Sequence, residues 1–240
     1  MNDYELPAWL VREGISNALA TYIADAPDVR SEIARFVLLH SKSVDRGATV
    51  IDIGAGSAPF REFFDVVEYI TVDWMENAPT TPERIDVRAS ATAVPLQGQS
   101  ADVIVLTEVL EHAADPSAVL REAARLLRPG GRLIGTTPFA WEFHEMPHDY
   151  YRYTPSAISL LLRESGFQDI AIDLRGSSLD VIGILAGKIE YLLRDDLRSE
   201  VADAIRDLSD AIARLRRSDV DLELAELSFP VGLSFSGVRP

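Results

Sequence analysis

The stretch that decides the fold reads Thr49-Val50-Ile51-Asp52-Ile53-Gly54-Ala55-Gly56-Ser57-Ala58-Pro59-Phe60. Its first half is a β-branched, apolar run, which is typical of a strand buried in a parallel sheet. Gly54 and Gly56 end the run and allow a sharp turn, where a ligand can reach main-chain N–H groups that a Cβ would screen. A helix start follows at Ser57. The pattern predicts the first strand–turn–helix unit of a nucleotide-binding α/β sheet.

Further strands alternate with helices along the chain. We expect them at residues 68–73, 84–89, 102–107, 132–137 and 167–174, with a last strand within 227–238. A helix begins at Asp115-Pro116-Ser117 and ends at Pro129-Gly130-Gly131, and another covers 158–164. Repeated βα units with short connections predict an α/β fold with a doubly wound, mostly parallel seven-stranded sheet.

Helical segments flank this core. Apolar periodicity predicts helices within residues 8–45 and at 179–193 and 197–215. The N-terminal helices are expected to form a packing layer or lid, and the alternative for them is a direct role in substrate binding. The helix at 197–215 carries a short heptad-like stripe, which either packs on the sheet or forms a homodimer seam. The predicted division is an N-terminal helical segment, a cofactor-binding α/β core, a helical insertion and the final strand of the core sheet, at residues 1–46, 47–175, 176–226 and 227–240.

The acidic composition and the absence of cysteine exclude or disfavour several kinds of binding partner and site. The chain has 38 acidic and 23 basic residues, a formal net charge of −15, which disfavours nucleic acid and anionic membrane surfaces as partners. It has no cysteine, which excludes disulfides, thiolate zinc sites and a cysteine nucleophile. We find no signal peptide and no apolar run of the roughly 18 residues that a membrane span needs. We therefore expect a cytoplasmic protein that acts on a small molecule.

Three features indicate the ligand of the glycine turn. A dinucleotide fingerprint needs a third glycine three residues after the second, and none follows until Gly98. Asp52, inside the strand, would repel a pyrophosphate but suits a cationic amino-acid group. Asp73 ends the second strand, where a carboxylate accepts the two ribose hydroxyls. A ligand with a ribose, no phosphate and a positive charge is S-adenosyl-L-methionine.

The motifs resemble those of class I S-adenosylmethionine-dependent methyltransferases of the type 11 pattern, over roughly residues 48–175. They read Val50-Ile51-Asp52-Ile53-Gly54-Ala55-Gly56, Val72-Asp73, Ala93-Val94-Pro95-Leu96, Ala101-Asp102-Val103-Ile104, Glu108-Val109-Leu110-Glu111-His112, Asp115-Pro116 and Leu127-Arg128-Pro129-Gly130-Gly131-Arg132-Leu133. The resemblance implies a Rossmann-like methyltransferase fold and methyl transfer.

The expected cofactor-binding set lies at the ends of successive strands. It comprises Asp52, Gly54, Ala55, Gly56, Asp73, Trp74, Ser90, Ala91, Thr107, Glu108 and His112. Trp74 and Met75 are placed to cover a face of the adenine ring, and the alternative for Met75 is packing in the core. Two positions depart from the family pattern. Ala58 replaces a third glycine, which costs little if its φ is negative, and Ser90 replaces an Asp that often contacts adenine.

A long, aromatic connection at residues 137–154 follows the fifth strand, and such loops in compact domains are usually functional. It resembles a His-Glu-x-Pro-His-Asp-Tyr-x-Arg-Tyr-Thr segment of bacterial methyltransferases near glycan and secondary-metabolite pathways. We expect it to line the acceptor pocket with Trp141, Tyr150, Tyr151, Arg152 and Tyr153. Arg152 suits a substrate carboxylate or phosphate, or else pairs with a neighbouring acid such as Asp149 or Glu145.

Three of the four histidines follow the fourth and fifth strands, namely His112, His144 and His148. A hydroxyl acceptor loses a proton, and His148, with Asp149 beside it in sequence, is our first choice of general base, ahead of His144. The alternative for both is a structural role in the loop. Residues 144–148 match the H-E-x-x-H zinc motif, but Pro147 excludes the regular helix that this motif needs. We assign no metal, although His144, His148 and Asp149 form an alternative divalent-ion site.

The sequence therefore predicts methyl transfer from S-adenosyl-L-methionine to a hydroxyl of a small polar metabolite, such as a sugar or natural-product scaffold. The alternatives are N-methylation of a small molecule, a nicotinamide-dependent oxidoreductase, and a catalytically inactive cofactor-binding protein.

Overall fold

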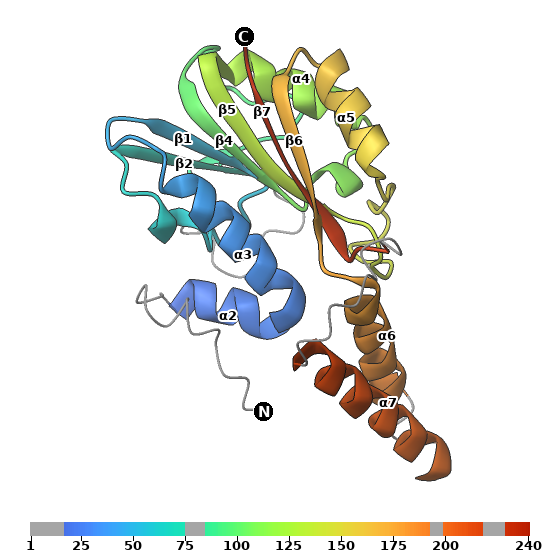
Figure 1. Cartoon of the computed structure of the whole chain (residues 1–240). Coiled ribbons are helices and arrows are strands. Elements are labelled where there is room, and N and C mark those ends of the chain that lie inside the picture. The colour runs from blue at the N-terminus through green and yellow to red at the C-terminus, as the bar shows by residue number, and fades with distance from the viewer. Residues whose placement is uncertain (1–16, 75–84, 193–198, 218–228) are drawn as a thin grey trace.

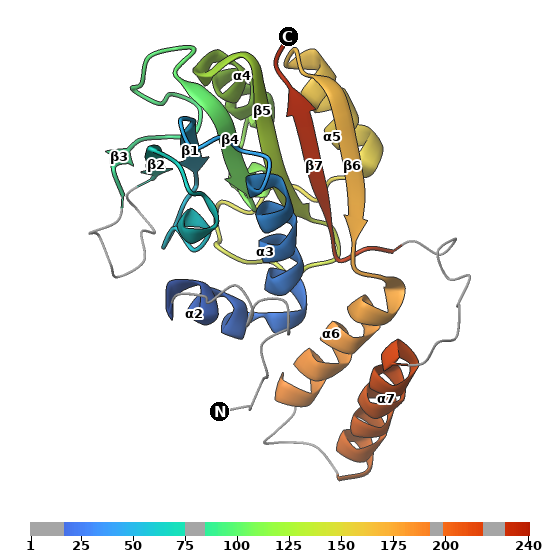
Figure 2. The same ribbon diagram turned by 60° about the vertical axis from the view of Figure 1, so that its left-hand side comes forward.

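The computed structural model describes residues 17–74, 85–192, 199–217 and 229–240. Its centre is a seven-stranded sheet in the order β3-β2-β1-β4-β5-β7-β6 (Figures 1 and 2). The strands are β1 Thr49–Ile53, β2 Glu68–Asp73, β3 Val87–Arg88, β4 Ala101–Thr107, β5 Leu127–Pro138, β6 Gln168–Arg175 and β7 Gly232–Val238. β7 runs antiparallel to β5 and β6, and the other pairs are parallel. The predicted Rossmann-like, mostly parallel sheet is confirmed.

Helices cover both faces of the sheet. The helices α2 (Asn17–Asp25) and α3 (Pro27–Ser41) lie on one face, and α4 (Pro116–Leu126) and α5 (Pro155–Glu164) on the other (Figure 1). Successive residues of β1 point to opposite faces, so Val50 packs with α2 and α3 while Ile51 and Ile53 pack with α4 and α5. This double burial explains the continuous apolar run of β1, all of which is buried.

The prediction of a helix that begins at Ser57 is wrong. The chain instead makes turns and one 3-10 helix, η1 (Arg61–Phe63), before β2. Ala58 was expected to replace a glycine at little cost if its φ were negative. Its φ is +51°, and this left-handed backbone conformation costs roughly 1 kcal/mol. Phe60, buried against α2 and α3, anchors this connection.

Two strand bounds also differ from the prediction. β3 has only two residues, Val87 and Arg88, whereas a strand was expected over residues 84–89. Arg84 of that expected range lies outside the described residues. β5 begins at Leu127 rather than at residue 132. The Gly130 and Gly131 backbone does not end a helix but stays in the strand, because Gly130 N donates to Arg239 O and Arg239 N donates to Gly131 O. The start of α4 is confirmed, since the Asp115 side chain accepts from Ala118 N.

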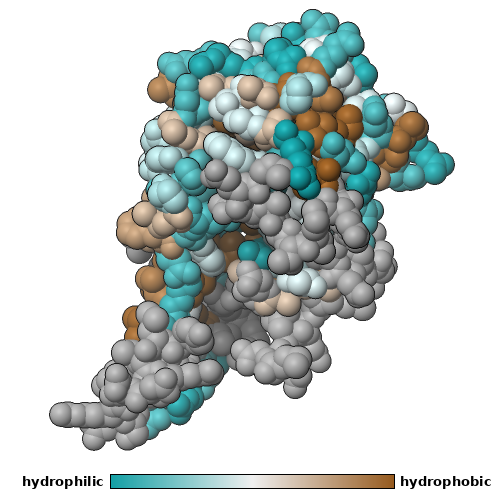
Figure 3. All heavy atoms as spheres, turned by 180° about the vertical axis from the view of Figure 1, so that it is seen from behind, coloured by the Kyte–Doolittle hydropathy of each residue, from teal (hydrophilic) through white to brown (hydrophobic). Residues whose placement is uncertain are grey.

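The predicted helical insertion before the last strand consists of α6 (Ser178–Leu192) and α7 (Ser199–Arg217), which pack together and project from the sheet (Figure 1). Ile182, Leu185 and Ile189 of α6 stay partly exposed, and brown hydrophobic surface is visible near the base of this projection in Figure 3. None of the helices in the described part of the chain is long and apolar enough to cross a membrane. The four-part division of the chain stays a prediction.

Candidate active site

A cavity of about 940 Å³ opens at the carboxyl ends of β1, β2 and β4. Ligand pockets typically measure ~300–1,000 Å³, so this one is large enough for a nucleoside ligand beside a small second molecule. Ten of the eleven expected cofactor-binding residues line it, namely Gly54, Ala55, Gly56, Asp73, Trp74, Ser90, Ala91, Thr107, Glu108 and His112. Met75 lies outside the described residues.

The two glycines of the turn face different surroundings. A Cβ on Gly54 would overlap Val109 Cγ2, whereas one on Gly56 would meet no atom within 4 Å. Gly56 N donates to Asp73 Oδ2 at 2.7 Å, which holds this carboxylate against the turn. An open backbone beside a fixed carboxylate fits a ribose whose hydroxyls donate to Asp73.

Asp52 is fully buried and does not line the cavity. Its Oδ2 accepts from the Tyr69 hydroxyl at 2.7 Å. Burial raises the pKa of Asp52 to about 7; the charge of Asp73 adds to this and the Tyr69 hydrogen bond opposes it. The cavity geometry therefore does not support the expected direct contact between Asp52 and a positive end of the ligand.

The opposite wall of the cavity comes from the loop after β5. Trp141, His144, His148 and Tyr150 line it, together with His112 from the 3-10 helix η4 (Leu110–His112). His148 Nδ1 lies 3.2 Å from the Tyr150 hydroxyl, and its ring centroid is 6.3 Å from that of Trp74. The structure thus brings both loop histidines to the same cavity as the glycine turn.

Three residues expected to line the acceptor pocket lie outside the cavity lining and bind other parts of the protein. Tyr151 and Tyr153 do not line the cavity; their hydroxyls donate to Ala114 O and Leu110 O, which fastens the loop to the segment around η4. Arg152 is likewise outside the cavity lining and serves as the structural partner of Asp149.

Asp149 pairs with Arg152 and His144, not with His148 as expected. Its nearly buried carboxylate accepts from Arg152 Nη1 at 2.6 Å, from Nη2 at 2.9 Å and from His144 N at 3.0 Å. These hydrogen bonds, chiefly that of Arg152, lower the pKa of Asp149 to about 2. Arg152 binds the Asp149 carboxylate in preference to the adjacent His148, because the guanidinium binds both carboxylate oxygens.

Arg175 of the cavity wall, and Glu111, a buried acid outside the cavity lining, are both absent from the expected set of site residues. Arg175, at the end of β6, is buried beside the cavity, and its Nη2 donates to Glu108 Oε1 at 2.8 Å and to Thr137 O at 3.1 Å. Glu111 of η4 is fully buried, and burial, with the charge of Glu108, raises its pKa well above the usual range. The position of Arg175 at a strand end was the only signal in the sequence.

The helices α2 and α3 also contribute to the cavity wall. Tyr22, Val29 and Arg30 line it, and Arg30 Nη1 donates to Tyr22 O. The N-terminal segment therefore combines the two roles expected for it, a packing layer on the sheet and a cover for the site. His40 of α3 lies outside the cavity lining, against Phe36.

Comparison with known sequences identifies the family. A family model described as a methyltransferase domain matches residues 26–172, more than half of the chain. An uncharacterized methyltransferase of Mycolicibacterium vanbaalenii is 34% identical over 132 residues, 50% of this chain and 52% of that protein. A ubiquinone biosynthesis O-methyltransferase of Pseudomonas fluorescens is 31% identical over 102 residues, 42% and 39% of the two chains. The match thus spans about half or less of these relatives.

Solved structures share the fold. A SAM-dependent methyltransferase from Archaeoglobus fulgidus aligns with a TM-score of 0.59 and 17% identity, covering 92% of this chain and 99% of that one. Phosphoethanolamine N-methyltransferase 2 of Haemonchus contortus, solved with S-adenosyl-L-methionine, aligns with a TM-score of 0.58 and 14% identity, covering 100% and 61%. The resemblance to class I methyltransferases, with S-adenosyl-L-methionine as the cofactor of the family, is confirmed, and the chain belongs to the methyltransferase-domain family.

Proposed function

We propose that this chain transfers the methyl group of S-adenosyl-L-methionine to a hydroxyl of a small polar molecule, such as a sugar or natural-product scaffold, with His148 as the general base. The observation that carries the proposal is the single cavity that joins the Gly56–Asp73 turn to the wall formed by Trp141, His148 and Tyr150. Cofactor and acceptor sites of a methyltransferase have to share one space, because the methyl passes directly between them.

The cofactor half of the cavity holds a nucleoside. Asp73 accepts the ribose hydroxyls, the open face at Gly56 lets the ligand approach the backbone, and Trp74 covers the adenine. When bound, S-adenosyl-L-methionine supplies an electrophilic methyl group on a sulfonium. Positioning of the acceptor and exclusion of water are then the main tasks of the protein.

The acceptor half combines aromatic walls with a base. Trp141 and Tyr150 provide apolar surface, and imidazole is the side chain best suited to take a hydroxyl proton near neutral pH. His148 takes this role ahead of His144 because the latter is bound by its backbone to Asp149 and by Nδ1 to Glu142 O. The Tyr150 hydroxyl at His148 Nδ1 orients the ring.

A methyl-transfer assay tests this proposal. Release of S-adenosylhomocysteine is measured with a panel of hydroxyl-bearing acceptors and with their amino-bearing counterparts. We expect turnover on hydroxyl acceptors and a drop of ~10²-fold in kcat for His148→Ala, with unchanged affinity for S-adenosylhomocysteine. His40→Ala, in the histidine outside the cavity, is the matched control and should keep full activity. Transfer to amines alone, or full activity of His148→Ala, would overturn the hydroxyl chemistry or the base.

A further inference from the structure

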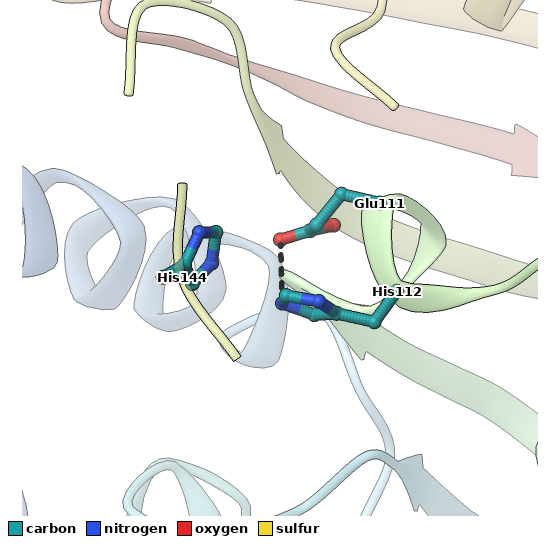
Figure 4. A group of neighbouring side chains, drawn as sticks. All are labelled: Glu111, His112 and His144. Atoms are coloured by element: carbon teal, nitrogen blue, oxygen red, sulfur yellow. Dashed lines mark ion pairs between the residues drawn. The ribbon is translucent and has the colours of Figure 1, made fainter. Parts of the chain in front are cut away.

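Three side chains with metal-binding atoms converge at the edge of the cavity. Glu111 and His112 come from η4 and His144 from the loop after β5, and they face one another in Figure 4. One ligand atom from each lies within 4.8 Å of the other two. The two imidazole rings are 4.6 Å apart between centroids.

Hydrogen bonds fix the tautomer of both histidines. Nδ1 of His112 lies 2.8 Å from His148 O, and Nδ1 of His144 lies 3.1 Å from Glu142 O. A carbonyl oxygen only accepts, so each Nδ1 carries a proton, and in the neutral form of each ring the lone pair of Nε2 is available to a metal. A carbonyl on the opposite ring nitrogen is the arrangement that usually orients a metal-binding imidazole.

One further contact of His144 has to be weighed against this assignment. Arg152 Nη2, a donor, lies 3.5 Å from His144 Nδ1. Its hydrogens are already used at shorter range by Glu142 O, at 2.7 Å, and by Asp149 Oδ2, at 2.9 Å. The longer contact therefore does not compete with donation from His144 Nδ1 to Glu142 O.

Glu111 provides the second, independent observation. It is fully buried, and no described residue donates a hydrogen bond to its Oε1. That oxygen points at the cluster, 3.8 Å from His112 Nε2. A buried carboxylate oxygen without a donor is costly unless a cation or a proton neutralises it. Glu145 Oε2 also lies 3.8 Å from His112 Nε2, and the Glu145 side chain is more than half exposed.

We propose that Glu111, His112 and His144 bind a divalent transition-metal ion. Two imidazoles and a carboxylate suit Zn²⁺ or its neighbours rather than Mg²⁺ or Ca²⁺, which take oxygen ligands. Ligand atoms around a tetrahedral ion with bonds of ~2.1 Å lie about 3.4 Å apart, so side-chain rotations of roughly 1 Å or less close the site. Both histidines line the cavity, which leaves a coordination position for a ligand there.

The role of the ion rests on the proposed function. Bound to the acceptor oxygen, it lowers the pKa of the hydroxyl, whose proton passes to His148. The oxygen then forms its bond to the methyl carbon, and the carbon–sulfur electron pair stays on sulfur, giving the methylated acceptor and S-adenosylhomocysteine. The step balances without an oxidant or reductant.

Metal titration of the full chain, first freed of metal with a chelator, tests the site. Zn²⁺ is titrated by calorimetry and Co²⁺ by its visible absorption, and the absence of cysteine removes any thiolate background. We expect one tight site per chain for both ions and at least ~10²-fold weaker binding of Mg²⁺. Glu111→Gln and His144→Ala should each weaken Zn²⁺ binding ~10-fold to 10²-fold while S-adenosylhomocysteine still binds, which shows that the variants fold.

The matched control is His40→Ala, which should bind Zn²⁺ like the wild type. Wild-type affinity in both site variants, or binding of Mg²⁺ as tight as that of Zn²⁺, would overturn the site. Two results separate failure of the metal site from failure of the proposed methyl transfer. Tight Zn²⁺ binding without methyl transfer to any hydroxyl acceptor refutes the proposed function and leaves the site, whereas turnover that survives complete metal removal refutes the role of the ion alone.

Discussion

Gly54 and Gly56 stand two residues apart in one turn, and both have a positive φ, +74° and +52°. A side chain at either position costs roughly 1 kcal/mol for the left-handed backbone. Only at Gly54 does a Cβ overlap a neighbour, Val109, whereas at Gly56 it enters open space beside the cavity. The same mutation therefore has different consequences at the two glycines.

We predict that Gly54→Ala loses an additional ~1–3 kcal/mol of stability through overpacking, and that Gly56→Ala chiefly weakens cofactor binding, by about 10-fold or more. Urea unfolding and calorimetry with S-adenosylhomocysteine measure the two effects. Equal stability losses together with wild-type affinity in Gly56→Ala would contradict the role of this turn.

Asp52 makes the stability of the fold depend on pH. Its folded pKa of about 7 lies above the ordinary value of 3.8, so the folded state holds a proton that the unfolded state releases. Its stabilising effect is complete below about pH 4 and is lost as the pH rises through 7. Three pKa units at ~1.4 kcal/mol each set an upper bound of about 4 kcal/mol.

Asp52→Asn should therefore flatten the fall in unfolding free energy between about pH 4 and pH 7. The amide oxygen can still accept from Tyr69, so the packing survives. Urea unfolding at a series of pH values measures the slope, with Asp65→Asn in the exposed Arg46–Asp65 pair as control. An unchanged slope in Asp52→Asn would show that Asp52 is already ionised in the folded protein.

At the scale of elements, the loop after β5 depends on Arg152. The guanidinium donates to both oxygens of Asp149 and to Glu142 O, so it links two separate parts of the loop. The Asp149 side chain is 1% exposed, and removal of its partner leaves an uncompensated buried charge. The Arg206–Asp203 pair of α7 has the same spacing in sequence but is more than half exposed.

Arg152→Met should cost about 3 kcal/mol or more of stability, and Arg206→Met less than about 0.5 kcal/mol. Thermal and urea unfolding of both variants give the comparison. Similar losses in the two variants would mean that burial does not set the strength of the Arg152 pair.

The elements that could be predicted are those whose pattern is local. β1, β2 and the start of α4 agree because apolar runs and an Asp–Pro cap are local signals. The start of β5 was missed because it depends on pairing of Leu127 with Ala101 of β4 and, at Gly130 and Gly131, on Arg239, more than a hundred positions along the chain. The Arg152–Asp149 pair was one of the stated alternatives, whereas the choice of His148 beside Asp149 rested on adjacency in sequence, which says little about which side chains meet in a loop.

At the scale of the whole molecule, the cavity combines segments from Tyr22 to Val231, which no local pattern relates. The strand ends could be predicted to meet because parallel strands present their carboxyl ends at one edge of the sheet. The N-terminal helices were expected as a packing layer or lid, but the contribution of Arg175 could not be predicted, because it depends on how β6 pairs with the antiparallel β7 at that edge.

Methyl transfer by this chain requires that the cavity bind S-adenosyl-L-methionine, with Asp73 on the ribose. Calorimetric titration of the chain with S-adenosylhomocysteine and with NADH tests it most directly, in the wild type and in Asp73→Ala. We predict one S-adenosylhomocysteine per chain, no binding of NADH, and a loss of ~10-fold to 10²-fold in affinity in Asp73→Ala, as expected when hydrogen bonds to a charged group are removed. Tight binding of NADH without binding of S-adenosylhomocysteine, or wild-type affinity in Asp73→Ala, would contradict the account.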